Sequence, residues 1–277
     1  MKAVIEIKGG FGNQIFQFAF AKHLSDLGVN VFVNYQNYTI FNLNYKYFGF
    51  RKASPYFVYI LKFLYKLFES KKYSFLYKVF FKNYFNKFSK PDEFNSKELK
   101  ALNHFDGYWQ DVQMLDKNKA YIIESLDKYS SFSYYKNSSK LHGLTLLHVR
   151  RGDYLKIKEN LKLDFYKQAI NHCRENIKEF KFDIFTDDVN WVKDQELFED
   201  AMNVFGPSKD LHTLLNEVSN MMKYENFIVG NSSFSLIPAI LSKNKATKIF
   251  VADPWFKNSS RDLNFDDSYL KLRNKNY

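Results

Sequence analysis

The chain has 277 residues, of which 45% are hydrophobic and 19% aromatic, and this composition excludes a disordered protein. Its 41 basic and 30 acidic residues give a net charge of +11. This charge favours an anionic partner but does not choose among nucleic acid, anionic lipid and a phosphorylated small molecule. The length allows one large core or two modest ones. The one cysteine, Cys173, excludes an internal disulfide, which fits a reducing compartment, and we expect it to be a core residue on a helix.

The N-terminus has the pattern of a strand rather than a charged segment followed by an apolar one, so we predict no signal peptide. The longest apolar stretches are shorter than the ~18 residues that a membrane-spanning helix needs. Lys62 and Lys66 interrupt the best of them. We therefore expect a cytoplasmic protein that is either soluble or peripheral on a membrane.

The first 33 residues predict a strand, a glycine-rich loop, a helix ended by Gly28 and a second strand. Such a unit implies a parallel sheet with a right-handed crossover. The expected helix carries one apolar face, made of Phe16, Phe20, Leu24 and Leu27.

The glycine-rich stretch GGFGNQ, residues 9–14, fits neither of two common nucleotide loops. It lacks the Gly-Lys-Ser/Thr end of a P-loop, and Ile15 stands where the dinucleotide-binding pattern has its last glycine. If the protein binds a pyrophosphate, the main grip must therefore lie elsewhere.

Residues 46–90 are rich in lysine and aromatic side chains and predict a pair of amphipathic helices. In the first, the polar side holds Lys62, Lys66 and Glu69, and the apolar side holds Ile60, Phe63, Leu64 and Leu67. Lys78 and Lys82 repeat the pattern in the second. The lysines are either the solvated face of helices packed on a sheet or part of a surface that lies on an anionic membrane.

Residues 129–140, YSSFSYYKNSSK, predict a linker, because they are polar, rich in serine and without periodicity. Strands and helices alternate again after it, with helices expected at 164–179, 208–222 and 233–242. We thus predict an α/β protein with two domains, 1–135 and 136–277, each built on a parallel sheet.

Ligands of open parallel sheets bind at the carboxyl ends of the strands, where HVRRGDY (148–154) follows an apolar run. An arginine fork suits a pyrophosphate better than a lysine does. Because adjacent side chains of an extended segment point opposite ways, we expect either Arg150 or Arg151 to reach a ligand directly. The other would pair with Asp153 or a neighbouring strand, and a purely structural Arg-Asp pair stays an alternative.

Two further strand ends are polar. FTDD places Asp187 and Asp188 where a carboxylate could accept the two N–H donors of guanine, although one of them could simply cap the next helix. The pair lacks the Asp-x-Asp spacing of metal-dependent sugar-nucleotide enzymes, so we predict no metal. VGNSSFS leads from a strand into a helix, where serines could cap the helix or, with its N-terminal amides, bind phosphate. Pro238 fits only if it lies in the first turn.

Together these stretches resemble the α-1,2-fucosyltransferases of glycosyltransferase family 11. The resemblance extends over nearly the whole chain, in family order, and rests on GGFGNQIFQFAFAKHL, GYWQD (107–111), HVRRGDY, FTDD and FIVGNSSFSLIPAILS (227–242). The chain departs from the common pattern after NSSFS, where many members have two tryptophans and this one has Leu236 and Ile237.

The resemblance implies a GT-B fold, with two facing Rossmann-like domains of which the first binds the acceptor and the second GDP-fucose. It implies an inverting transfer of L-fucose, without a metal cofactor, to the 2-OH of a terminal galactose. A lipid-linked or O-antigen glycan as acceptor would place a basic enzyme on the inner face of the cytoplasmic membrane.

The resemblance also implies roles for particular residues. Arg150 would stabilise the leaving pyrophosphate, His148 would support it or orient the arginine, and Asp153 is a candidate base, although it could equally be held in an ion pair. The donor-binding set would consist of Gly10, Gly12, Asn13, Gln14, Arg151, Asp187, Asp188, Asn231, Ser232, Ser233 and Phe234.

Two other functions remain open from the residues. A nucleic-acid binder would explain the net charge of +11 but not the polar strand ends. A transferase that uses another nucleotide sugar, or an inactive homologue that serves as an interaction module, would keep the same motifs.

Overall fold

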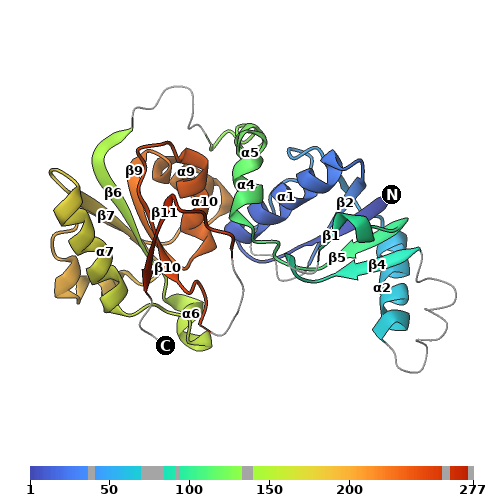
Figure 1. The fold of residues 1–277 in the computed structure, drawn as a ribbon. Helices are drawn as coiled ribbons and strands as arrows, with labels where there is room; N and C mark the ends of the chain where they lie inside the picture. The colour runs from blue at the N-terminus through green and yellow to red at the C-terminus, as the bar shows by residue number, and fades with distance from the viewer. Residues whose placement is uncertain (37–40, 70–83, 92–93, 133–139, 258–262, 274–277) are drawn as a thin grey trace. The chain divides into compact units, whose positions relative to one another are not determined.

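The computed structural model describes residues 1–36, 41–69, 84–91, 94–132, 140–257 and 263–273 (Figure 1). The chain forms two compact units, Met1–Leu126 and Asp127–Tyr277, called the N-terminal and C-terminal units below. The boundary predicted between residues 135 and 136 falls outside the described residues, as do residues 133–139 of the predicted linker.

The described part of the N-terminal unit holds a parallel sheet of strand order β3-β2-β1-β5-β4. Its strands are β1 (Lys2–Ile7), β2 (Asn30–Tyr35), β3 (Arg51–Lys52), β4 (Phe85–Phe88) and β5 (Leu102–Phe105). Its helices are α1 (Phe11–Asp26), α2 (Pro55–Glu69), the 3-10 helix η3 (Ser96–Glu98), α4 (Val112–Lys117) and α5 (Lys119–Leu126). Figure 1 shows α1 on one face of this sheet and α2 on the other. The order of the strands reverses between β1 and β5, which makes this a place for a ligand crevice.

Helix α1 takes up most of the expected glycine loop. It begins at Phe11, so Gly12 to Gln14 lie in its first turn, and Lys8, Gly9 and Gly10 connect it to β1. Gly28 ends it with φ +78°, as predicted. Leu27 lies beyond the last turn and is 41% exposed, so the expected apolar face ends at Leu24.

Helix α2 packs on the sheet through part of the predicted apolar side, since Leu64 is buried and Ile60 packs beside it. Leu61 and Leu64 are buried against Val4 and Phe85, whereas Phe63, predicted on the apolar side, is 50% exposed. The packed face is centred on Leu61 and Leu64 rather than on Phe63. The sequence did not resolve this, because both sides of the helix carry large apolar residues. The predicted helix with Lys78 and Lys82, and the side chains of Leu67 and Glu69, lie outside the described residues. None of the helices in the described ranges has the length and apolarity to cross a bilayer.

The described part of the C-terminal unit holds a second parallel sheet, of order β11-β10-β9-β6-β7-β8. Its strands are β6 (Leu141–Val149), β7 (Lys181–Thr186), β8 (Val204–Phe205), β9 (Tyr224–Gly230), β10 (Ile249–Asp253) and β11 (Tyr269–Arg273). Its helices are α6 (Gly152–Ile157), α7 (Leu163–Asn176), α8 (Val189–Lys193), η4 (Glu196–Phe198), α9 (Leu211–Met221) and α10 (Ser233–Ser242). The predicted α/β class with two parallel sheets is confirmed, whereas the facing arrangement of two domains stays a prediction.

The core of the C-terminal unit explains where its helices lie. Alternate residues of β6 and β7, such as Leu147 and Ile184, pack against α7, in which Cys173 is fully buried, as predicted. Helices α9 and α10 pack against each other, and α10 packs on β9. Helix α7 ends at Asn176 rather than at residue 179, because Ile177 is already extended.

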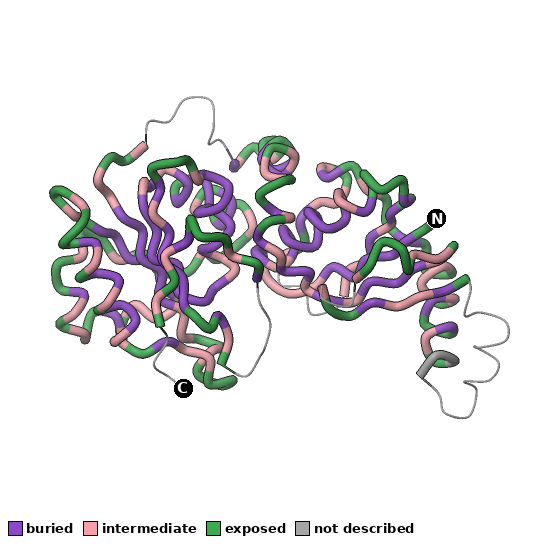
Figure 2. The backbone as a smooth tube through the Cα atoms, viewed as in Figure 1, coloured by how far each residue is buried: buried purple, intermediate pink, exposed green. Residues whose placement is uncertain are grey.

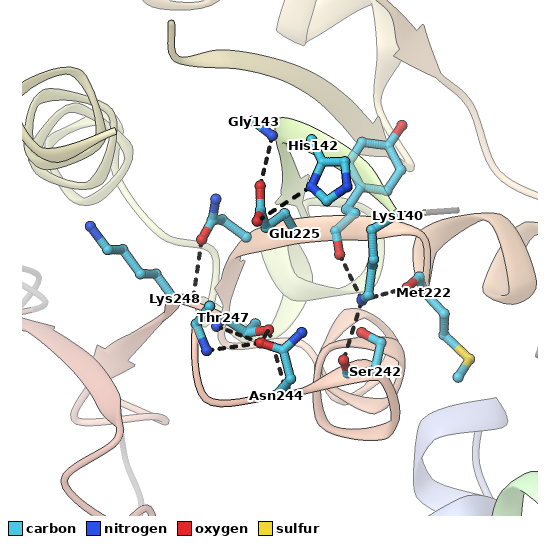
Figure 3. Close-up of polar contacts among 12 residues, drawn as sticks. Lys140, His142, Gly143, Met222, Glu225, Ser242, Asn244, Thr247 and Lys248 are labelled. Atoms are coloured by element: carbon cyan, nitrogen blue, oxygen red, sulfur yellow. Dashed lines mark hydrogen bonds and ion pairs between the residues drawn. The ribbon is translucent and has the colours of Figure 1, made fainter. Parts of the chain in front are cut away.

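A lysine fixes the start of the second sheet. Lys140, the last residue of the predicted linker, donates hydrogen bonds from Nζ to the carbonyls of Met222, Tyr224 and Ser242 at 3.0, 3.1 and 3.2 Å (Figure 3). Beside it, the Gly143 N–H donates to Oε2 of Glu225 at 2.7 Å. An ammonium shared by three carbonyls joins β6 to β9 and to the end of α10, at the end of the sheet opposite the candidate site described next.

Candidate functional site

The motifs at the ends of strands come together in the C-terminal unit. The order of its sheet reverses between β6 and β9, and β7 lies on the other side of β6. HVRRGDY begins in the last two residues of β6, FTDD spans the end of β7, and NSSFS follows β9, so all three lie at neighbouring carboxyl ends. Such a switch point is where open α/β sheets bind ligands.

Arg150 lies between two carboxylates. Its guanidinium donates to Oδ1 of Asp153 at 2.7 Å and to Oδ2 of Asp187 at 2.9 Å. The side chain is 33% exposed, and Asp153 is the more exposed partner, at 62% against 13% for Asp187. The buried carboxylate therefore positions the guanidinium, and the exposed one occupies the side open to solvent. Of the two interpretations of Asp153, the ion pair is the one present.

Arg151 is held by Asp188, which follows the neighbouring strand β7. Its Nε donates to Oδ2 of Asp188 at 3.0 Å, and its guanidinium lies 3.8 Å from the ring centre of Trp191. Its side chain is 16% exposed, half as much as that of Arg150. Both arginines thus make ion pairs, and Arg150 is the one with more surface left for a ligand.

The two aspartates expected to contact guanine have other partners. Asp187 binds Arg150 and also accepts the backbone N–H of Arg151 at 2.8 Å. Asp188 is the N-cap of α8, accepting the N–H of Trp191 at 3.2 Å, in addition to its pair with Arg151. The capping alternative is therefore the one seen for Asp188, and the predicted base-reading role of this pair has no support from its contacts.

Gly152 is a residue whose importance the sequence did not indicate. A Cβ at this position would lie 2.6 Å from Oδ2 of Asp187. Only glycine lets β7 bring that carboxylate close enough to hold Arg150. The glycine between RR and DY was the available signal.

His148 is buried and stays neutral. It is 4% exposed, and its Nδ1 has no hydrogen-bond partner among the described residues. Burial, together with the positive charge of Arg150, lowers its pKa from 6.5 to about 3. Its ring centre lies 5.8 Å from that of Phe234 on α10. A phosphate here would therefore meet an uncharged imidazole.

The stretch after β9 lines the other side of the switch point. Asn231 is buried, and its Nδ2 donates to the backbone carbonyl of Glu159 at 2.8 Å. The backbone carbonyl of Asn231 accepts from the hydroxyl of Tyr154 at 3.2 Å. Ser232 is the N-cap residue of α10, but its hydroxyl makes no capping hydrogen bond, contrary to the expected cap. Ser233 and Phe234 form the first turn and are partly exposed.

Helix α10 differs from the prediction in the position of Pro238, and it shows where Leu236 and Ile237 lie. Pro238 lies in its second turn rather than its first, so the helix forgoes one backbone hydrogen bond. Leu236 and Ile237, which stand where many family members have tryptophans, are both fully buried. They are core residues of this helix and offer no surface to an acceptor.

The remaining two motifs meet in the N-terminal unit, at the reversal between β1 and β5. Asn13 of GGFGNQ accepts from Nε2 of Gln110 of GYWQD at 2.8 Å. Gly10 is the partly exposed N-cap of α1, and Gly12 is buried in its first turn. Next to them Lys8 forms an ion pair with Asp106 at 2.7 Å. The sequence did not indicate that these two motifs form one site.

Gln14 was predicted to bind the donor, but its side chain makes hydrogen bonds inside the N-terminal unit instead. Its side chain is fully buried, and its Nε2 donates to the carbonyls of Gly9 and Phe41 at 3.2 and 2.5 Å. Its Oε1 accepts the N–H of Leu43 at 3.0 Å. The carboxamide therefore fastens the segment after β2 to the start of α1, since a buried amide must satisfy its donors and acceptor.

A buried carboxylate near the ends of β1, β2 and β5 also escaped the sequence analysis. Glu6 is 1% exposed and accepts from Asn34 and Gln36 at 2.7 and 2.5 Å. Nε2 of His104 lies 2.8 Å from its other oxygen. Both faces of β1 are buried from Ala3 to Ile7, so the strand pattern alone predicts an apolar residue at position 6.

A pocket of about 470 Å³ lies elsewhere in the C-terminal unit, between α9 and the strands β7 and β8. Phe185, Phe205 and Tyr224 form part of its wall, together with Glu217, whose pKa burial raises. None of the predicted site residues lines it. In the described ranges, no three side chains of His, Cys, Asp or Glu are grouped so as to hold a metal ion.

Two parallel sheets, each with polar motifs at a switch point, define the class of α/β proteins that bind ligands at strand ends. The family model of glycosyl transferase family 11 matches residues 5–272, and the chain belongs to that family. It is accordingly a glycosyltransferase, which acts with a nucleotide sugar on a glycan.

Two relatives come from Escherichia coli. An alpha-1,2-colitosyltransferase is 28% identical, over 92% of each chain. The O-antigen biosynthesis glycosyltransferase WbnK is 24% identical, over 69% of this chain and 68% of the relative.

Two solved structures are similar at lower identity. NodZ alpha-1,6-fucosyltransferase soaked with GDP-fucose is 12% identical, with a TM-score of 0.42 and coverage of 87% of this chain and 92% of the other. The E. coli heptosyltransferase WaaC with ADP-2-deoxy-2-fluoro heptose is 10% identical, with a TM-score of 0.44 and coverage of 99% and 93%.

Proposed function

We propose that the protein is an inverting galactoside 2-alpha-L-fucosyltransferase that transfers L-fucose from GDP-fucose to the 2-OH of a terminal galactose in a glycan. The observation that carries the donor site is Arg150, held at the switch point of the C-terminal sheet by Asp187 and open to solvent on one side. Membership of glycosyl transferase family 11 and an α-1,2-transferring relative support the reaction.

In this reaction the galactose oxygen forms a bond to the anomeric carbon of fucose while the bond from that carbon to the phosphate oxygen breaks. GDP leaves with the bonding electrons, and the hydroxyl proton passes to solvent or a base. Negative charge grows on the pyrophosphate, and a fixed guanidinium lowers the free energy of that transition state. A phosphate oxygen would take the place of Asp153 on Arg150, which leaves Asp187 to hold the arginine.

A neutral histidine and a helix N-terminus would also contribute to the proposed donor site. His148 would contribute a hydrogen bond rather than a charge, because its pKa is near 3. The N-terminus of α10 carries a partial positive charge, and Asn231, Ser232, Ser233 and Phe234 lie at that end. Arg151 would act through position, by fixing the segment between β6 and α6 to Asp188.

We assign the acceptor to the N-terminal unit. Its switch point also carries Gly10, Gly12 and Asn13, whose predicted contact with the donor stays a prediction. Amides and carboxylates are the groups that proteins use to bind sugar hydroxyls, since they accept and donate in fixed directions. Asp106, whose side chain is 33% exposed, is therefore a candidate acceptor residue, whereas the buried Glu6 is already bound by protein groups.

A donor and acceptor screen tests the proposal. Purified protein with GDP-fucose and galactose-terminated oligosaccharides should release GDP and form a product heavier by one fucose, with linkage to O2 by NMR. The same screen includes nucleotide-linked colitose and other nucleotide sugars as donors, because one relative is named for colitose. Consumption of another sugar nucleotide, with no reaction of GDP-fucose, would show that the fucosyl assignment is wrong while leaving the family intact.

We also propose that no metal cofactor is needed, since guanidinium and helix charges are assigned to the pyrophosphate. Turnover should be unchanged, within twofold, after dialysis against EDTA, measured by GDP release with and without added Mg²⁺ or Mn²⁺. Loss of activity on chelation and its return with a divalent ion would overturn this proposal.

A further inference from the structure

Helix α2 has an inner face that packs on the sheet and an outer face whose aromatic side chains are exposed. On the inner face Leu61 and Leu64 are 1% and 7% exposed and pack with Val4 and Phe85. Phe32 and Phe57 add an edge-to-face ring contact with centres 5.7 Å apart. These contacts fix the helix on the sheet, and Figure 2 shows buried and exposed residues close together along α2.

The outer face is aromatic. Tyr56, Tyr59 and Phe63 are 74%, 69% and 50% exposed, and steps of three and four residues put them in one row along the helix. Large apolar side chains exposed in a row, on one element, mark a surface that binds something.

The surroundings of that row are cationic. Lys62 and Lys66 are exposed on the same helix, and Arg51 and Lys52 are exposed just before it. Residues 51–66 contain these four basic residues and no aspartate or glutamate. The chain as a whole carries +11, so the surface complements a partner that is both anionic and able to accept aromatic rings.

A bilayer with anionic phospholipids meets both requirements. Tyrosine and phenylalanine partition to the boundary between headgroups and acyl chains, where a ring is buried and a hydroxyl stays wet. Lysine ammonium groups are attracted by the negative surface potential and reach headgroup phosphates on flexible stems. Nucleic acid would use the charges, but stacking requires bases that are already unpaired.

We propose that the outer face of α2, formed by Tyr56, Tyr59, Lys62, Phe63 and Lys66, docks the protein on an anionic phospholipid surface. The contact lies on the N-terminal unit, to which we assign the acceptor, and it does not depend on which sugar is transferred. Docking there would favour acceptors that are themselves anchored in the membrane.

Flotation of the full chain with vesicles tests the proposal. Binding to vesicles of 70% phosphatidylcholine and 30% phosphatidylglycerol should exceed binding to pure phosphatidylcholine at least tenfold, and should weaken as salt rises. The double variant Lys62→Gln/Lys66→Gln should lose about 10- to 30-fold in partition coefficient, from about 1 kcal/mol per lysine. Tyr56→Ser/Tyr59→Ser/Phe63→Ser should reduce binding to both kinds of vesicle.

A matched control is Lys178→Gln/Lys245→Gln, which removes two exposed lysines from the C-terminal unit and should bind like the parent. Thermal unfolding and turnover with a soluble acceptor should be unchanged in all variants, which separates lost docking from lost folding or catalysis. Equal binding of the parent to neutral and anionic vesicles would overturn the proposal, as would unchanged binding of the Lys62/Lys66 variant. Preference for a single-stranded polynucleotide over anionic vesicles would overturn it in favour of nucleic acid.

Discussion

Replacement of Arg150 by lysine is expected to lower kcat/KM for sugar transfer by about 10²–10³-fold without unfolding the protein. Lysine keeps the positive charge but cannot hold Asp187 and a phosphate oxygen at once with a planar fork. The buried carboxylate would then keep the ammonium away from the leaving group. Initial rates of GDP release, with saturating acceptor and varied donor, measure the effect.

Arg174→Lys is the matched control, because Arg174 is exposed in the same unit and pairs with Asp200 at 2.6 Å, away from the strand ends. It should be within twofold of the parent. Arg151→Lys should be intermediate and should lower the melting temperature, since it loses packing on Trp191. Near-normal turnover by Arg150→Lys would refute the role assigned to Arg150.

Acid should destabilise the protein through His148. The pKa of this residue is about 3 in the folded chain and near 6.5 in the unfolded chain, so between these values the unfolded state binds more protons. The stability associated with the neutral ring is complete above pH 6.5 and falls as the pH drops toward 3. The slope approaches about 1.4 kcal/mol per pH unit, or about 2 kcal/mol between pH 7 and pH 5.

Urea unfolding of the parent and of His148→Gln, at pH 7 and pH 5, measures this contribution. The parent should lose about 2 kcal/mol more than the variant on acidification. The control His212→Gln removes an exposed histidine from α9 and should lose as much stability between pH 7 and pH 5 as the parent. Parallel losses for the parent and His148→Gln would show that the ring is charged, or reaches water, in the folded protein.

The sequence predicted the strands that carry a strong apolar signal and missed those fixed by their neighbours. β6 and β9 are long apolar runs, whereas β3 has two residues and β11 alternates apolar with charged residues at the sheet edge. The bounds of helices α6 and α8 were not predicted, because at 6 and 5 residues they are too short to show helical periodicity. Such elements depend on tertiary contacts more than on local preference.

Polar strand ends led to the correct edge of the sheet but not to the partners of each side chain. Which carboxylate Arg150 would select among Asp153, Asp187 and Asp188 depends on the register of β6 and β7. The role of Gly152 depends on the same register. For Gln14, the segment to which it bonds lies 27 residues away, which no local pattern encodes.

The pair between Arg150 and Asp153 also bears on turnover. If GDP-fucose is the donor, as proposed, an exposed carboxylate that binds the guanidinium would compete with an incoming phosphate and would weaken binding of both the donor and the released GDP. The arginine is then never left without a counter-ion when the product departs, and departure does not have to overcome its full attraction. We therefore expect the pair between Arg150 and Asp153 to lower the affinity for GDP, to speed product release and to limit inhibition by accumulated GDP.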